Sequence, residues 1–187
     1  MVNAQPYFVW LLLAFLAMVP EVSIPAEKKE TAEPCSYQDI RKRWRFPDLP
    51  GWQLNDTDSR VIDGSVFYPP GKSMDDSDRS LGVTAVPKAE GGPSMLHYIE
   101  RRVQHYRDIF KGAVKQTTGI RDVRGNVVPV YTFTPSPDVK YKAAYQSAVY
   151  LEDELCYIRV LMIASSSEDH ERVRPSFERL VAGFRKK

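Results

Sequence analysis

The chain has 187 residues, enough for one domain that buries its own core, and 43% of them are hydrophobic. Its 26 Lys and Arg stand against 24 Asp and Glu, a net charge of +2, which gives no reason to expect a nucleic acid as partner. This composition, with only two Cys, also excludes a disordered chain, a protein with several membrane spans and a small scaffold held together by disulfides.

Residues 1–26 predict export. They include an apolar run at residues 7–19 and contain no Lys or Arg. A run of this length fits the hydrophobic core of a secretory signal peptide, about 7–15 residues, and is shorter than the roughly 20 that span a bilayer. We expect a signal peptide cleaved after Ala26 or, because no basic residue precedes the run, an uncleaved N-terminal anchor that contacts the membrane surface. Residues 27–34 are charged and predict a linker, followed by a single domain over residues 35–187.

The first half of this domain predicts a helix followed by strands. Residues 36–46 favour a short helix that ends before a proline. Residues 50–54 and 60–68 lie on either side of a polar turn and favour a β-hairpin. Residues 72–80 are polar and acidic, which predicts a loop, and residues 81–86 alternate between apolar and polar side chains, which predicts a strand.

The clearest helical pattern covers residues 95–111, with Ser94 in the position of an N-cap. Its apolar residues recur at every third or fourth position, so we expect them on one buried face. They are Leu96, Ile99, Val103, Tyr106 and Phe110. The opposite face carries charged residues and is expected in solvent.

Four strands are predicted next. Residues 113–123 and 127–134 flank a Gly-Asn pair typical of a hairpin turn. Pro129 cannot donate a ladder hydrogen bond, so we expect its strand to be an edge or to pair on one side there. Residues 140–151 and 155–164 follow, and the second of these is apolar on both faces, which predicts a central strand covered from both sides.

Residues 168–182 predict a closing helix that stops at Gly183. Pro175 lies within this range, so we expect it in the first turn or at a kink. Grouped strands with few helices indicate an α+β fold: a single antiparallel sheet of about six to seven strands with helices packed on its faces.

Two short segments resemble the PsbP-like superfamily. Residues 64–71, Gly-Ser-Val-Phe-Tyr-Pro-Pro-Gly, are similar to its first hairpin, in which a glycine and alternating aromatics precede Tyr-Pro-x-Gly. Residues 177–185 are similar to its closing helix, which ends in a small residue followed by Phe. A departure follows the hairpin, because residues 72–74 stand where the family commonly has an aromatic.

The superfamily includes extrinsic proteins of photosystem II, a related Ran-binding nuclear import factor and many exported bacterial proteins. The resemblance implies an α/β/α sandwich and a mostly non-enzymatic role. It transfers no functional residue to a position of this sequence.

Catalytic and metal-binding patterns are absent from the sequence. The histidines His97, His105 and His170 have no zinc-type spacing, and His170 stands in a polar helix start, where we expect it in solvent. The acidic residues 75–78 lack the order of a calcium loop and favour a solvated loop. There is no nucleophile motif and no phosphate-binding glycine motif. We therefore predict no catalytic residue, no metal and no cofactor.

One run of residues is a candidate for binding anions: Arg41, Lys42, Arg43, Trp44 and Arg45. Basic side chains around an aromatic suit phosphates, anionic lipid head groups or acidic polysaccharide. The alternative is an exposed helix face with Trp44 packed inward. The basic residues 185–187 either extend this patch or interact with the dipole of the last helix.

Cys35 and Cys156 are the two cysteines of the chain. In an oxidising compartment they can form a disulfide between the start of the domain and the predicted central strand. The alternative is two unpaired thiols, with Cys156 as a small core residue. Both interpretations stay open at this point.

Together these patterns predict an exported, non-catalytic binding or assembly accessory protein of the cell envelope, located in the periplasm or outside the cell. Its partner is expected to be a protein in an envelope or membrane complex. One alternative is an exported hydrolase with an unrecognised site on the open sheet face or in the loop 72–80. Another is a module that binds anionic lipid or polysaccharide through residues 41–45.

Overall fold

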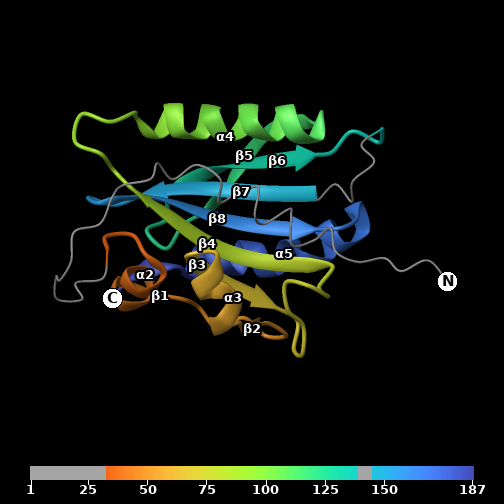
Figure 1. Ribbon diagram of the computed structural model, residues 1–187, viewed down its shortest axis with the longest axis horizontal. Helices are drawn as coiled ribbons and strands as arrows, with labels where there is room; N and C mark the ends of the chain where they lie inside the picture. The colour runs from red at the N-terminus through yellow and green to blue at the C-terminus, as the bar shows by residue number, and fades with distance from the viewer. Residues whose placement is uncertain (1–32, 139–144) are drawn as a thin grey trace.

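In a computed structural model of the chain, which describes residues 33–138 and 145–187, helices cover both faces of one antiparallel sheet (Figure 1). In spatial order its strands are β2 (Gln53–Leu54), β3 (Gly64–Tyr68), β4 (Arg79–Pro87), β8 (Cys156–Ala164), β7 (Tyr145–Glu152), β6 (Val127–Thr134) and β5 (Ala113–Arg121). A separate two-stranded ribbon joins β1 (Trp44–Arg45) to β9 (Arg185–Lys186). The seven-stranded sheet confirms the predicted α+β class.

Among the described residues, four helices accompany these strands: α2 (Tyr37–Arg43), α3 (Asp56–Val61), α4 (Met95–Phe110) and α5 (Ser167–Gly183). Helix α4 packs on one face through Ile99, Tyr106 and Phe110. Helix α5 packs on the other face through Val173, Phe177 and other buried residues. The arrangement is the α/β/α sandwich that the family resemblance implied.

Strand β8 lies at the centre of the sheet, between β4 and β7. All of its residues except Tyr157 are buried, because it has a strand on each side and a helix over each face. The prediction of a central strand covered from both sides is confirmed, and it follows from the apolar residues on both of its faces.

Helix α4 begins as predicted, with the Ser94 hydroxyl accepting a hydrogen bond from the backbone N–H of His97. Its buried face, however, differs from the predicted one at Leu96, whose side chain is 62% exposed. Tyr98 lies against the sheet instead, with its ring against those of Tyr150 and Tyr157. The buried face is therefore centred nearer to Tyr98 and Ile99 than the spacing of the aliphatic residues indicated.

Two expectations for the start of the domain need correction. The first helix ends at Arg43, because Trp44 and Arg45 leave it to pair with β9. The predicted hairpin of β2 and β3 is present, but its connection is α3 and not a polar turn. Asn55 starts this short helix by accepting a hydrogen bond from the backbone N–H of Asp58.

The prolines in the second half are accommodated differently. Pro129 lies in β6 outside the residues paired with β7, and it faces a β-bulge between Thr117 and Ile120 of β5. Strand β6 is thus not an edge, and the missing N–H of Pro129 removes no ladder bond. Pro175 lies well inside α5, not in its first turn. The carbonyl that it leaves without a helical partner belongs to Glu171, which is exposed to water.

A disulfide joins Cys35 to Cys156, with Cα atoms 5.9 Å apart, and ties the start of the domain to the first residue of β8. The structure therefore decides for the bridge and against two thiols.

Within residues 33–138 and 145–187 no helix has the length and apolar character needed to cross a membrane. The predicted signal peptide or anchor, residues 1–26, and most of the predicted linker lie outside the described residues.

Candidate functional site

The two ends of the described chain meet at the β1–β9 ribbon, beside α2 (Figure 1). Trp44 and Phe184 hold them together, since their rings stack with centroids 4.6 Å apart and both side chains are buried. Gly183 precedes Phe184, and a Cβ there would lie 2.5 Å from the Cβ of Pro47. Any larger residue at position 183 would therefore clash with Pro47, which explains why a small residue precedes Phe184 in this chain.

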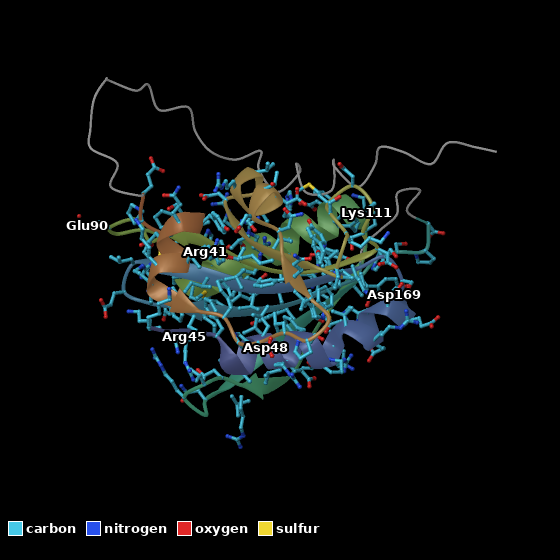
Figure 2. All side chains as sticks on the ribbon, turned by 90° about the horizontal axis from the view of Figure 1, so that it is seen from below. Arg41, Arg45, Asp48, Glu90, Lys111 and Asp169 are labelled. Atoms are coloured by element: carbon cyan, nitrogen blue, oxygen red, sulfur yellow. A yellow bond between two sulfur atoms is a disulfide. The ribbon has the colours of Figure 1, made fainter. Side chains whose placement is uncertain are left out.

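This ribbon gathers basic side chains into one area, which we call the cationic surface. It consists of Arg41, Lys42, Arg45, Arg185, Lys186 and Lys187, all exposed. The last residue is fixed by two bonds to the end of α2: its backbone N–H donates to the Arg43 carbonyl and its Nζ to the Arg41 carbonyl. Figure 2 shows Arg41 and Arg45 on the same side of the molecule, away from Asp169 at the start of α5.

Residues 185–187 therefore extend the predicted patch. Arg45 and Arg185 are direct partners in the antiparallel register of the ribbon. Side chains of directly opposed residues point to the same side of a sheet, and like charges in such positions destabilise the pairing. The ribbon accordingly holds two guanidinium groups near each other at some cost to its stability.

Acidic neighbours neutralise only part of this surface. Arg41 pairs with Asp56 at 2.7 Å, and Lys186 lies 3.8 Å from a carboxylate oxygen of Glu154. Lys42, Arg45 and Arg185 form no ion pair with any acid in the described part of the chain. These three cations are available to an anionic partner.

Two members of the predicted patch do not belong to the surface. Trp44 is packed inward, as one of the two interpretations expected. Arg43 forms an ion pair with Asp39 within α2 and a second one with Asp153, which connects α2 to the turn between β7 and β8. Burial alone would raise the pKa of Asp153, but amide hydrogen bonds from Leu155 and Cys156 and the Arg43 guanidinium outweigh it and lower this pKa. Arg43 thus has a structural role.

The structure does not gather the histidines into a metal site, and no cluster of metal-binding side chains is found within residues 33–138 and 145–187. His97 is exposed on α4, while His105 is partly buried on the same helix. In the acidic loop, the carboxylate of Asp76 is bound within the loop itself, because it accepts hydrogen bonds from the backbone N–H and the hydroxyl of Ser73.

The expectation that His170 lies in solvent is wrong, because its side chain is only 4% exposed. Its Nε2 and the Ser147 hydroxyl oxygen are 3.0 Å apart, so the ring connects α5 to β7. The sequence carried a signal for this position: His170 lies three residues before Val173 and seven before Phe177, and therefore on the apolar face of the helix.

Ser147, His170 and Glu171 follow the order of nucleophile, base and acid found in hydrolases, with 3.7 Å between His170 Nδ1 and the Glu171 carboxylate. Ser147 is nevertheless buried beneath α5, where no substrate reaches its hydroxyl. A nucleophile has to meet the reacting carbon, so these three residues are better explained as a packing contact.

His170 predicts a pH dependence of stability. Burial is the main cause that lowers its pKa from the ordinary value, so the folded protein holds the ring neutral while the unfolded chain binds a proton near pH 6.5. We expect the contribution of His170 to be complete above about pH 7 and to be lost as the pH falls through and below 6.5. Urea unfolding between pH 8 and pH 5 measures this loss.

In the same experiment, His170→Gln is expected to flatten the pH dependence over this range and to lower stability at pH 8 by about 1–3 kcal/mol, through the altered buried hydrogen bond. His97→Gln, at an exposed position, is the control and should change neither quantity. An unchanged slope in His170→Gln would contradict the assignment.

No protein-family model and no curated protein sequence matches this chain. Among solved structures it is similar to the solution structure of cyanobacterial PsbP (CyanoP) from Synechocystis sp. PCC 6803, with 15% sequence identity and a TM-score of 0.52. The similarity covers 86% of this chain and 98% of that one. It confirms the PsbP-like fold that residues 64–71 and 177–185 indicated.

Proposed function

We propose that this PsbP-like domain is an exported, non-catalytic binding or assembly accessory of the cell envelope, which docks on an acidic protein partner through the cationic surface. One observation carries the proposal: Arg45 and Arg185 oppose each other across a two-residue ribbon, and neither forms an ion pair within the described part of the chain. A carboxylate of a partner that binds between them relieves their repulsion and forms charge-assisted hydrogen bonds.

Export is supported by the disulfide between Cys35 and Cys156, since such bonds persist in oxidising compartments. The apolar run at residues 7–19 supports the same route. A role in binding is favoured over hydrolysis because the arrangement of Ser147, His170 and Glu171 is closed to substrate.

The test reverses the three unpaired cations. The triple variant is Lys42→Glu, Arg45→Glu, Arg185→Glu. The wild-type protein is first crosslinked to the solubilised envelope of the source cells, in parallel with the variant, and the captured partner is identified and purified. This partner is then titrated with both proteins. We expect the variant to bind at least about tenfold more weakly at low salt, with a smaller difference at high salt, because charged interface residues act mainly through screened, long-range attraction.

A matched control carries three reversals elsewhere: Arg107→Glu, Lys115→Glu and Arg124→Glu, all at exposed positions. It should bind as the wild-type protein does. Equal loss in both variants, or no loss in either, would overturn the cationic surface as the docking site. If the protein were recovered only as a free monomer, the accessory role would be overturned. Salt-dependent binding only to vesicles with anionic lipid or to acidic polysaccharide would favour the alternative of a lipid- or polysaccharide-binding module.

A further inference from the structure

A small cavity lies on the other side of the sheet from α5, between α4 and strands β6, β7 and β8. It measures about 420 Å³ when its part open to solvent is included, but its enclosed part has room for about one water-sized group. Its walls are mainly apolar, with Phe110, Phe133 and Leu161 among them. The cavity has a simple origin in β7: Ala148 stands between Gln146 and Tyr150 on the face toward α4, and its short side chain leaves the space unfilled.

Two deeply buried polar side chains reach this cavity from adjacent strands. Gln146 of β7 is 3% exposed and Arg159 of β8 is 6% exposed. Among the described residues, the Nε2 of Gln146 has no hydrogen-bond partner. A buried amide N–H without a partner costs about 1–3 kcal/mol, so a group that accepts from it is favoured.

The side of α4 adds hydrogen-bond donors and positive charge. Arg102 and His105 line the cavity, and both make other interactions within the protein, as does Arg159. Tyr150 of β7 also lines the cavity, and burial raises the pKa of its hydroxyl to about 12, so this group stays protonated and can donate. Among the described residues that form the lining, none is Asp or Glu. The polar groups of the cavity thus favour an acceptor with negative charge.

We propose that this cavity binds the carboxylate group of a small organic acid, with the Gln146 amide as donor and the positive charge of Arg159 and Arg102 as attraction. The apolar walls weaken the screening of these charges by water. The enclosed part has room for about one water-sized group, enough for a carboxylate oxygen, and the remainder of the acid would lie toward the side of the cavity that is open to solvent. Burial lowers the pKa of the Arg159 guanidinium, an effect that a bound anion opposes.

The probe for this site is sodium acetate, compared with sodium chloride and sodium phosphate at constant ionic strength in thermal unfolding of the full chain. We expect acetate to raise the midpoint temperature of unfolding, with an effect that saturates as the acetate concentration increases. The rise should be about 5–10 °C at about a hundredfold excess of acetate over its Kd. Two-dimensional NMR of the arginine Nε–H groups should show the Arg159 signal shifting with the same saturation curve. An equal or larger effect of chloride or phosphate would overturn the carboxylate specificity.

Gln146→Glu is the decisive variant, because it keeps the shape of the side chain and places a carboxylate inside the cavity itself. It should lose the response to acetate, both in the midpoint and in the NMR titration. Gln116→Glu, the same exchange at an exposed position of β5, should keep the full response.

Gln146→Leu provides a second variant in case the buried carboxylate prevents folding. It removes the unpartnered amide, and it should fold and bind acetate more weakly. Absence of a saturable response in the wild-type protein, or an unchanged response in both Gln146 variants, would show that the cavity holds water only and would overturn the proposal. The triple variant of the cationic surface should respond to acetate as the wild type does.

Discussion

Removal of the disulfide between Cys35 and Cys156 is expected to lower the free energy of unfolding by about 4–5 kcal/mol in the chain-entropy account of cross-links. The bridge closes a sequence separation of 121 residues, so the oxidised unfolded chain has far fewer conformations than the reduced one. Both cysteines are buried in the folded protein, where Cys156 begins the central strand. The effect therefore acts mainly on the unfolded state.

Guanidinium unfolding of three samples measures this effect: the oxidised protein, the reduced protein and the variant Cys35→Ala, Cys156→Ala. The reduced protein and the variant should be destabilised by similar amounts, and the variant should no longer respond to reductant. Titration of the denatured, unreduced protein should find no free thiol. Two free thiols, or a reductant effect below about 1 kcal/mol, would contradict the predicted role of the bridge.

The elements predicted correctly from the sequence are those whose pattern is local and repeated. Strand β8 was placed at the centre of the sheet because both of its faces are apolar. Helix α4 was placed by its spacing and by the N-cap Ser94. In each case the side chains that pack against the core recur with the period of their own element, so no knowledge of distant partners is needed.

The elements that escaped prediction depend on distant partners. The ribbon of β1 and β9 has two residues on each strand, too few to show a period, and its two strands come from opposite ends of the domain. The sequence of residues 36–46 therefore predicts Trp44 and Arg45 within the first helix, whereas they form β1. Helix α3 is similarly short, and its start at Asn55 depends on one capping bond.

The candidate site was predicted in part. The charge of residues 41–45 predicts a basic patch, and the basic residues 185–187 are one possible extension of it. Which of these cations remain unpaired could not be predicted, because the acids that pair with Arg41 and Arg43 come from α3 and from the turn after β7. The cavity near Gln146 could not be predicted either, since it results from the absence of a large side chain at Ala148.

Replacement of Phe184 by Ala is expected to lower the free energy of unfolding by about 3–5 kcal/mol, as for other buried Phe residues. The ring is 2% exposed, stacks on Trp44 and lies 5.4 Å from Phe46, so its loss leaves a cavity that two other aromatics cannot easily fill. Because the β1–β9 ribbon follows directly from this stack, the variant should also lose part of the binding that depends on Arg45 and Arg185.

Urea unfolding and the partner titration together test this coupling between the core and the cationic surface. Phe184→Leu fills most of the volume and should cost less than Phe184→Ala, with most of the binding retained. Leu96→Ala, at a side chain that is 62% exposed, is the control and should change stability by less than about 0.5 kcal/mol. A Phe184→Ala variant that is less stable but binds the partner as the wild type does would contradict this coupling. The cationic surface would then form without the aromatic stack, and the geometry of the ribbon would depend on the bonds that Lys187 makes with α2.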